Sequence, residues 1–528
     1  MVTNHHVPAV FQQNPRTTQV DYRSNRQWTG KELHDKILNV ASALVDVYQF
    51  KPNTPVCIHY INSDISTILA LGVIIAGGIV ASSYPKDPYP EVLHMARKVE
   101  PKFIFCHHYE LQWAAKLEAD MGYPVFGIVM GDKATEEHLQ FKHIQHLLNY
   151  DHRQSRALPH LPVACSDIHK QTGFILMSSG TTGKPKAVPA THWSCLVDMI
   201  GFESRINRAK DQVFATPAAL DYTSGRMLQL GTIAYGNKLV LMDNFTIEKY
   251  LEIVQSHKVS ALALGVSTLY NVITYDKVDE YDLSSLRTVF PMGAKVVFMD
   301  ELRKFLDKLP NIKHVIYGYG ASEYSVAVVS CVRPEDFLRS CDDCGSPLPG
   351  VYFKVVDTSS GEMLGPNVPG MLHVKSIPQF PGYYDIQEKH RRRQDRMDKA
   401  KVPAMETDSD TTVDSPFISN KDIFDADGFY ITGDIGYLNE EGHVFIMGRE
   451  KEVMACRGAK KVMPIELEEL IGEHNCVSRV CVLGVPKRDE SLVMCPRAFV
   501  VPVIECYQQT PEESRTMLEH KTNGHNNR

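Results

Sequence analysis

The stretch that decides the fold reads Phe174-Ile175-Leu176-Met177-Ser178-Ser179-Gly180-Thr181-Thr182-Gly183-Lys184-Pro185-Lys186. Its apolar start is typical of a buried strand, and a loop rich in glycine, serine and threonine follows. Backbone amides and hydroxyl groups of such a loop can surround phosphate oxygens, and the two lysines add positive charge. The Walker A pattern does not fit, because Pro185 follows Lys184. The segment predicts a phosphate-binding loop, with a flexible hydroxyl-rich turn as the alternative.

Helices and short apolar strands alternate on both sides of this loop. Helical periodicity covers residues 31–48, and further helices are expected at about 245–257 and 297–308. Strands are expected at residues 56–60, 103–105, 125–129, 261–264, 288–290 and 314–317. The apolar stretch 68–81 predicts a buried helix that turns at Gly77-Gly78 into a strand. This alternation is typical of a mostly parallel sheet in an α/β architecture.

The pattern of expected helices and strands changes after residue 350. Short β segments such as 352–356 and 371–374 replace the alternation. Residues 390–419 are polar, begin with an arginine triplet and then become acidic, which predicts a disordered surface insertion. A docking or phosphorylation segment is the alternative for this stretch. A polar tail is expected from residue 506 to 528, with one helix starting near Thr510.

Composition places the chain among ordinary globular proteins. It has 528 residues, with 63 acidic residues against 56 lysines and arginines, and 43% of its residues are hydrophobic. The net charge of −7 argues against nucleic acid as a partner, since phosphate backbones favour basic surfaces. The 12 cysteines are scattered, which favours a reducing compartment. Cys341 and Cys344 form one isolated CxxC pair without the further ligands that a structural zinc site needs.

Targeting signals are not visible in the sequence. Residues 1–15 are polar and lack an apolar signal-peptide core, and the last three residues are no peroxisomal signal. The longest apolar stretch, 68–81, is shorter than the roughly 20 residues that span a bilayer. We therefore expect a soluble cytoplasmic protein without a transmembrane segment.

Further motifs lie before and after the loop segment, in a fixed order along the chain. They are 68–85 with its glycines, Thr191-His192, Tyr317-Gly318-Tyr319-Gly320-Ala321-Ser322-Glu323, 344–350, Tyr430 to Tyr437 with Gly448-Arg449, and Gly458 with 464–468. Together with the loop, this set resembles the adenylate-forming superfamily of acyl- and aryl-CoA ligases, firefly-type luciferases and peptide-synthetase adenylation domains. The resemblance spans about residues 25–503.

The resemblance implies a large N-terminal α/β domain of layered sheets and helices and a small, mobile α+β C-terminal lobe. The expected boundaries are a large domain at 1–448, a hinge at 449–451 and a shortened lobe at 452–505. The implied reaction activates a small carboxylic acid with ATP and Mg²⁺, then forms a thioester with CoA. A carrier protein supplied as a separate chain is an alternative acceptor.

The resemblance also implies roles for individual residues. Glu323 would bind Mg²⁺, and Glu323 and Lys186 are the catalytic candidates. Tyr319 would face adenine, Ser322 the α-phosphate, and Asp434 the ribose with Arg449 nearby. The nucleotide-binding candidates are Ser178, Ser179, Gly180, Thr181, Thr182, Gly183, Lys184, Gly293, Ala294, Tyr317, Gly318, Tyr319, Ser322, Asp434 and Arg449.

Two departures from the family pattern and one ambiguous residue bear on function. The lysine-bearing motif near the family's C-terminal end is missing after residue 503, and Ala455 stands where many relatives have a lysine. Asp221 lies roughly where amino-acid-activating relatives bind an ammonium group, but a helix N-cap role is the preferred interpretation. The sequence therefore supports three hypotheses: an active acyl- or aryl-CoA ligase, an adenylation-only or carrier-loading enzyme, and a non-catalytic nucleotide-binding homologue.

Overall fold

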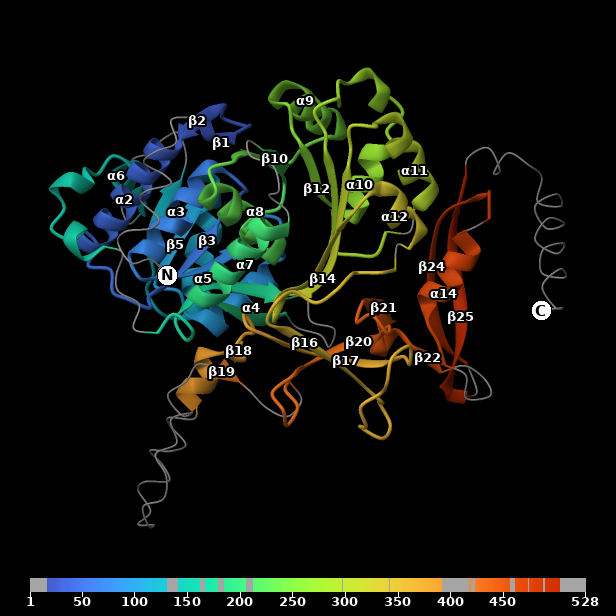
Figure 1. Ribbon diagram of the computed structural model, residues 1–528. Coiled ribbons are helices and arrows are strands. Elements are labelled where there is room, and N and C mark those ends of the chain that lie inside the picture. The colour runs from blue at the N-terminus through green and yellow to red at the C-terminus, as the bar shows by residue number, and fades with distance from the viewer. Residues whose placement is uncertain are drawn as a thin grey trace, which may run out of the picture. The chain divides into compact units, whose positions relative to one another are not determined.

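The computed structural model describes residues 17–130, 141–161, 167–178, 185–205, 212–296, 298–340, 342–391, 417–418, 423–455, 461–472, 474–487 and 490–503. The chain forms two compact units, Met1–Phe353 with Val374–Ile431, and Lys354–His373 with Thr432–Arg528. The first unit contains two large sheets whose inner strands run parallel (Figure 1). This arrangement confirms the expected α/β class.

The first sheet carries the predicted phosphate loop. Its seven strands have the order β7-β6-β5-β3-β4-β8-β9, and only β9 runs antiparallel to its neighbour. In that order the strands are β7 (Phe141–His143), β6 (Phe126–Met130), β5 (Phe103–His107), β3 (Pro55–His59), β4 (Ile79–Ser83), β8 (Thr172–Ser178) and β9 (Lys186–Thr191).

The second sheet carries the segment around Glu323. Its eight strands have the order β15-β14-β13-β12-β10-β11-β1-β2, with an antiparallel pair at each edge. In that order they are β15 (Ser325–Val332), β14 (His314–Ala321), β13 (Thr288–Met292), β12 (Ala261–Gly265), β10 (Val213–Thr216), β11 (Lys238–Leu241), β1 (Thr17–Asp21) and β2 (Arg26–Thr29).

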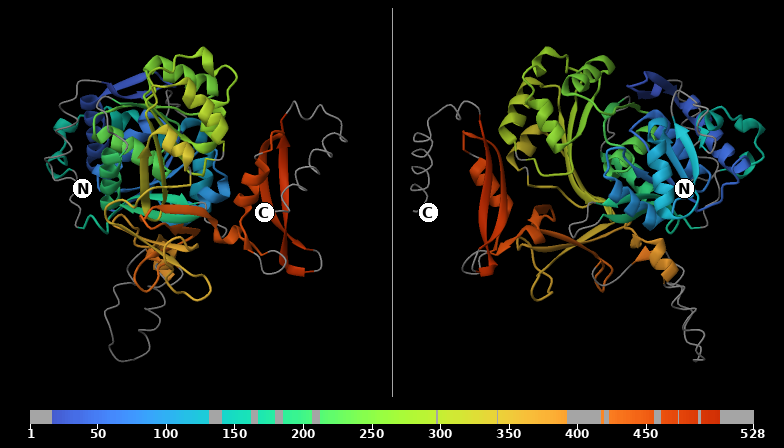
Figure 2. Two further views of the ribbon diagram at one scale, coloured as in Figure 1. Left: turned by 45° about the vertical axis from the view of Figure 1, so that its right-hand side comes forward. Right: turned by 180° about the vertical axis from the view of Figure 1, so that it is seen from behind.

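Helices cover both sheets. Along the chain they are α2 (Gly30–Asp46), α3 (Asp64–Ile75), α4 (Tyr89–Val99), α5 (Leu111–Met121), α6 (Gln145–Leu148), α7 (His192–Arg205), α8 (Thr223–Ala234), α9 (Ile247–His257), α10 (Val266–Ile273), α11 (Met299–Lys308) and α12 (Pro334–Arg339). Helices α9 to α12 gather beside strands β10 to β14 (Figures 1 and 2). Between the helices and the strands lie the apolar cores of the unit.

Local sequence explains how the first helices form and pack. Thr29 and Glu32 make a reciprocal capping box that satisfies backbone N–H groups at the start of α2. Helix α3 packs on α2 at Gly72, where a Cβ atom would lie 2.4 Å from a Val40 methyl group. Glycine is therefore required at this crossing, and the following Gly77-Gly78 turn leads into β4 as expected.

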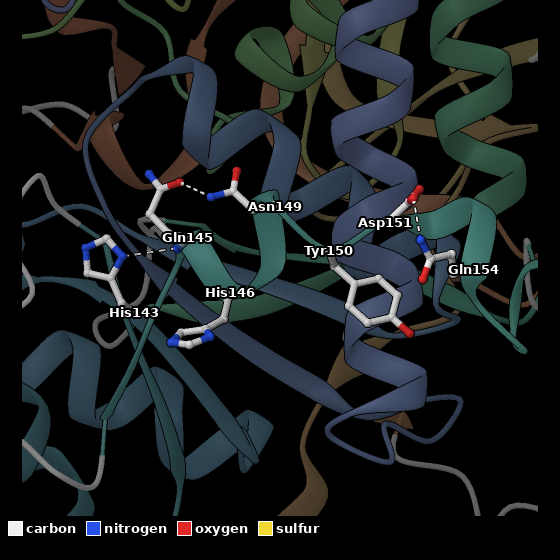
Figure 3. Close-up of a pocket in the computed structure, with 7 residues that line it drawn as sticks. All are labelled: His143, Gln145, His146, Asn149, Tyr150, Asp151 and Gln154. Carbon is white, nitrogen blue, oxygen red and sulfur yellow. Dashed lines mark hydrogen bonds between the residues drawn. The ribbon is translucent and has the colours of Figure 1, made fainter.

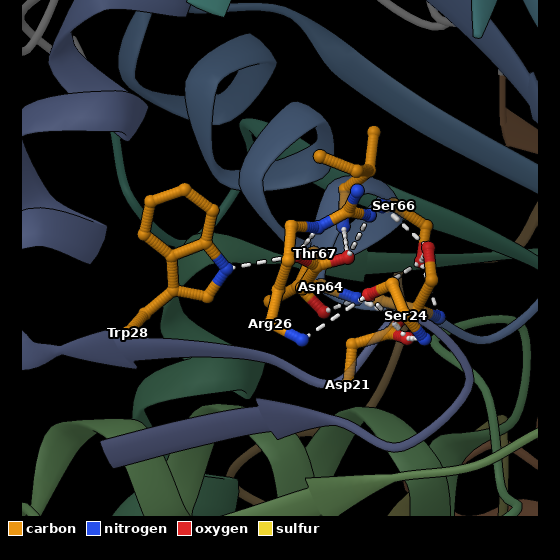
Figure 4. Close-up of polar contacts among 9 residues, drawn as sticks. Asp21, Ser24, Arg26, Trp28, Asp64, Ser66 and Thr67 are labelled. Atoms are coloured by element: carbon orange, nitrogen blue, oxygen red, sulfur yellow. Dashed lines mark hydrogen bonds and ion pairs between the residues drawn. The ribbon is translucent and has the colours of Figure 1, made fainter. Parts of the chain in front are cut away.

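The start of α3 is fixed by a buried carboxylate (Figure 4). Asp64 is fully buried and accepts hydrogen bonds from Arg26 Nε at 2.8 Å, Arg26 Nη2 at 3.0 Å and Trp28 Nε1 at 2.8 Å. The backbone N–H of Asp64 donates to Asp21, whose pKa is raised by burial and by the charge of Asp64. These contacts tie β1 and β2 of the second sheet to α3.

The second unit contains most of a four-stranded sheet and the C-terminal elements of the chain. A four-stranded sheet has the order β16-β17-β20-β21, with β16 (Val351–Val356), β17 (Gly370–Ser376), β20 (Tyr430–Leu438) and β21 (Val444–Arg449). The C-terminal elements are β22 (Met454–Ala455), β23 (Lys461–Val462), α14 (Pro464–Gly472), β24 (Val477–Lys487) and β25 (Glu490–Pro502). The predicted hinge at 449–451 and the lobe boundary at 452 stay predictions.

The helices and strands expected from periodicity are confirmed, with small shifts at their ends. Most of the predicted insertion at 390–419, and the whole tail at 506–528, lie outside the described residues; Phe417–Ile418 form strand β19, which pairs with β18 (Tyr383–Tyr384). Seven of the described cysteines are free thiols, and Cys476 is disulfide-bonded. The expected reducing compartment stays a prediction. Among the described residues, every helix is too short or too polar to span a membrane.

Candidate active site

The predicted phosphate loop leaves and re-enters the first sheet at one place. Ser178 ends β8 and Lys186 begins β9, and these two residues are direct partners across the antiparallel pair. Residues 179–184, which include Ser179, Gly180, Thr181, Thr182, Gly183 and Lys184, lie outside the described residues. The hydroxyl of Ser178 is buried and has no hydrogen-bond partner among the described residues. A buried hydroxyl without a partner could donate a hydrogen bond to a phosphate oxygen.

Glu323 occupies the tip of the β14–β15 hairpin. The strands pair up to Ala321 and Ser325, so residues 322–324 form the turn. A Cβ atom on Gly318 would lie 2.3 Å from the carbonyl oxygen of Val328, so glycine is needed for this close strand approach. Glu323 is only 8% exposed, and its carbonyl oxygen accepts a hydrogen bond of 2.9 Å from the N–H of Phe380.

Tyr383 connects the two predicted catalytic residues. Its hydroxyl donates to Glu323 Oε1 at 3.1 Å, and Lys186 Nζ lies 4.6 Å from the centre of its ring. Tyr430 O–H lies 3.3 Å from the same hydroxyl. Burial, followed by the charge of Glu323, raises the pKa of Tyr383, so the phenol stays protonated and keeps donating. The structure thus brings Lys186 and Glu323 together from different sheets.

Sequence reasoning missed Tyr383. The only signal for it was a Gly-Tyr pair, Gly382-Tyr383, at the edge of the predicted polar insertion. A tyrosine after glycine has many possible structural roles, so the pair alone does not indicate a contact with Glu323.

Ser322 and Tyr319 lie on the same hairpin as Glu323. Ser322 Oγ accepts a hydrogen bond of 3.0 Å from Thr223 Oγ1, at the start of α8. Tyr319 is half-buried, and its ring lies 5.8 Å from that of Tyr324. Tyr317 differs, because its side chain is buried in the core and packs edge-on against Phe337 at 5.3 Å. Its side chain therefore helps to hold β14 in place.

Gly293 and Ala294 follow strand β13, which lies beside β14. Both are exposed, and Gly293 has a φ of +87°, a left-handed conformation that favours glycine. Parallel strands present their carboxyl ends at one edge of a sheet, where ligands bind in open α/β folds. Because β13 and β14 are parallel, these two residues and the Glu323 hairpin follow the same edge.

The second unit brings Asp434 and Arg449 together. They are direct partners between β20 and β21, and Arg449 Nε lies 2.9 Å from Asp434 Oδ1. Asp434 is 4% exposed, and its backbone N–H donates to Thr432 Oγ1 at 2.9 Å. A buried carboxylate paired with a guanidinium can also accept hydrogen bonds from hydroxyl groups.

The sequence of this chain is similar to those of known enzymes. A sequence model described as "AMP-binding enzyme" matches residues 7–384. The chain belongs to the AMP-binding enzyme family. Over 446 residues it is 26% identical to "Probable 4-coumarate--CoA ligase 3" of Dictyostelium discoideum, which covers 81% of this chain and 73% of the relative.

Solved structures of adenylate-forming enzymes share the fold. The anthranilate CoA ligase AuaEII in complex with anthranoyl-AMP matches with a TM-score of 0.77 at 17% identity, over 99% of this chain and 91% of that one. ATP-bound MatB from Rhodopseudomonas palustris matches with a TM-score of 0.72 at 20% identity, over 94% and 88% of the two chains. These matches confirm the expected fold, with a large N-terminal domain and a small C-terminal lobe.

Asp221 does not have the N-cap role expected from the sequence. The residue that precedes α8 is Tyr222, and it makes no side-chain capping hydrogen bond. Asp221 Oδ1 is buried without a hydrogen-bond partner among the described residues. Burial, with a smaller effect of Asp87, raises the pKa of Asp221 to about 6. The N-cap interpretation is therefore wrong, because the side chain does not reach the N–H groups at the start of the helix.

A surface hollow of about 880 Å³ lies away from the family motifs (Figure 3). Its lining residues are His143, Gln145, His146, Asn149, Tyr150, Asp151 and Gln154. Several of these hydrogen-bond to one another, as Asn149 Nδ2 does to Gln145 Oε1 at 3.2 Å. None of the predicted site residues lines the hollow, so it is not the candidate active site.

Proposed function

We propose that this protein activates a carboxylic acid with ATP to an acyl-adenylate, releases pyrophosphate, and then transfers the acyl group to CoA. The observation that carries the proposal is the contact of Tyr383 with both Lys186 and Glu323, at the point where the phosphate loop joins the first sheet. Membership of the AMP-binding family and similarity to a probable 4-coumarate–CoA ligase support the same reaction class.

In the proposed reaction, a carboxylate oxygen attacks the α-phosphorus of ATP, and the bond to the bridging oxygen of pyrophosphate breaks. The loop from Ser178 to Lys184, with Lys186, would hold the departing pyrophosphate oxygens. Tyr319 would face adenine, while Ser322 would donate near the α-phosphate. Catalysis of this kind rests on positioning and charge neutralisation rather than on covalent chemistry by the protein.

The donor set around Glu323 fits Mg²⁺. The cation takes oxygen ligands and is commonly held by one or two carboxylates together with substrate phosphates. Glu323 supplies a carboxylate that Tyr383 already orients, and the described residues contain no cluster of three acidic, histidine or cysteine ligands. When bound, the ion would neutralise charge on the phosphates. We propose the ribose as the partner of Asp434 and Arg449.

The buried carboxylate oxygen of Asp221, unpaired among the described residues, favours a second class of carboxylic acid as the substrate. An ionised carboxylate with an unpaired buried oxygen suits a substrate that carries an ammonium group. Amino acids are therefore candidate substrates beside the aryl acids that the relatives' names suggest. A carrier protein would then be a reasonable acyl acceptor in place of CoA.

A two-stage experiment tests the proposal. Isothermal titration measures binding of ATP, and pyrophosphate release is followed with a panel of aryl acids, fatty acids and amino acids. Release that depends on one acid supports adenylation, and product analysis after adding CoA or a carrier protein identifies the acceptor. ATP binding without pyrophosphate release for any acid favours the non-catalytic alternative and contradicts the proposal.

A further inference from the structure

A buried ion pair lies behind the hairpin that carries Glu323. Arg226 Nη2, on α8, donates to Asp198 Oδ2, on α7, at 2.9 Å, and the two side chains are 1% and 4% exposed. The guanidinium lies 5.9 Å from the ring of Phe174. Its Nε and Nη1 atoms have no hydrogen-bond partner among the described residues. Arg226 therefore depends on Asp198 for charge compensation in the core.

Asp198 uses its other oxygen to hold the hairpin. The hydroxyl of Ser325 donates to Asp198 Oδ1. Ser325 closes the hairpin turn with a φ of +62°, a left-handed conformation in which glycine and asparagine are normally preferred. Serine has no conformational advantage there. Its hydroxyl, which reaches the buried ion pair, gives a physical reason for its presence.

This contact is one of several that anchor the hairpin turn. The carbonyl oxygen of Glu323 accepts from the Phe380 N–H at 2.9 Å, and that of Tyr324 accepts from Ser376 Oγ at 3.1 Å. Both of these anchors lie on the segment that also carries Tyr383. The bond from Ser325 ties the end of the turn to α7 and, through Arg226, to α8, while Thr223 Oγ1 of α8 donates separately to Ser322 Oγ at 3.0 Å.

We propose that the Arg226–Asp198–Ser325 relay is a positioning device that fixes the Glu323 carboxylate for the metal-bound nucleotide. The inference rests on the proposed function of Glu323. A metal-binding carboxylate must be held within a fraction of an ångström, and the relay fixes the residue two positions after it. The three relay residues act through Glu323 and are not catalytic residues.

The test uses Ser325→Ala and Ser325→Gly, because Asp198→Asn would leave the charge of Arg226 uncompensated in the core and could unfold the protein. Both serine variants remove the hydroxyl, and the glycine variant also relieves the left-handed backbone. Ser194→Ala is the matched control, since Ser194 is a buried serine on α7 whose hydroxyl donates to the nearby carbonyl oxygen of Thr191.

The full-length variants are compared by hydrogen exchange of peptides covering residues 314–332 and by the Mg²⁺ concentration that gives half-maximal pyrophosphate release. Both Ser325 variants should exchange faster in this segment and need about tenfold more Mg²⁺, a change that corresponds to about 1.4 kcal/mol. The Ser194→Ala control should match the wild type in both measurements.

Wild-type behaviour of Ser325→Gly in either measurement overturns the inference, because the hydroxyl would then be dispensable and only the backbone conformation would matter. Failure of the wild type to release pyrophosphate with any acid contradicts the proposed function instead. In that case the exchange comparison still decides whether the relay holds the hairpin, since it needs no turnover.

Discussion

Replacing Glu323 with glutamine changes one charge at the centre of the candidate site. The amide oxygen of glutamine can still accept the hydrogen bond that Tyr383 donates to Oε1 at 3.1 Å, and the side-chain shape is kept. The carboxylate charge is lost. We expect the variant to fold normally and to bind ATP, while its response to Mg²⁺ weakens and its pyrophosphate release falls.

The size of the effect follows from the burial of Glu323. The residue is 8% exposed, so water screens its charge poorly and a bound cation would feel it strongly. Removal of one positioned charged or polar group from a reacting site typically raises the barrier by about 2–4 kcal/mol. This corresponds to a loss of about 30- to 1,000-fold in rate. The free energy of unfolding should change by less than about 1 kcal/mol. The hydrogen bond from Tyr383 becomes weaker, but a buried charge is removed at the same time.

A coupled assay of pyrophosphate release, titrated with Mg²⁺ at saturating acid, measures this change. Glu335→Gln is the matched control, since Glu335 is an exposed acid on α12. Urea denaturation of both variants checks that folding is unaffected. A wild-type Mg²⁺ response in Glu323→Gln would refute the assignment and show that another acid holds the metal.

Three further predictions concern the charges of the first unit. Burial raises the pKa of Asp221 to about 6, above its value of about 3.9 in the unfolded chain. The ionised carboxylate therefore lowers the free energy of unfolding above about pH 6, and this destabilisation disappears below about pH 4. Asp221→Asn should therefore raise the free energy of unfolding by about 2 kcal/mol at pH 8 but not at pH 4, as measured by urea denaturation. Arg26→Met should lower it by about 2 kcal/mol at pH 7, because fully buried Asp64 loses a two-point ion pair, and an unchanged midpoint would contradict this role. Lys186→Met keeps the aliphatic stem, so melting should stay the same while pyrophosphate release falls about 30-fold or more, and full activity would exclude Lys186 from the reaction.

Much of the fold could be predicted because local pattern and burial agree. Helix α2 begins at a capping box and has apolar residues at helical spacing, and the inner strands are short apolar runs bounded by turns. The Gly77-Gly78 turn after α3 was visible in the sequence for the same reason. The close contact of Gly72 with Val40 was not visible, because it depends on how two helices cross.

The site was predictable only where a linear motif carries it. The loop after β8, the turn at Glu323 and the pair formed by Asp434 and Arg449 all lie within motifs. Tyr383 escaped prediction because its role depends on two residues that are distant in sequence. Asp221 was misinterpreted, since an aspartate near a helix start is usually a cap and nothing local shows that its side chain is buried instead.

The ion pair of Arg226 and Asp198 shows the same limit. Each is a charged residue on a helix, and a solvent-exposed position is the ordinary expectation for such a side chain. Only the packing of α7 against α8 and β15 buries both, and only the left-handed turn at Ser325 brings its hydroxyl to Asp198.

Acid-dependent exchange of labelled pyrophosphate into ATP tests the central claim most directly, because it reports reversible formation of the acyl-adenylate and needs neither CoA nor a carrier protein. We predict exchange that requires Mg²⁺ and one class of carboxylic acid and that falls at least about 30-fold in Glu323→Gln. Exchange no faster in the wild type than in Glu323→Gln, with every acid tested and with ATP bound, would contradict it.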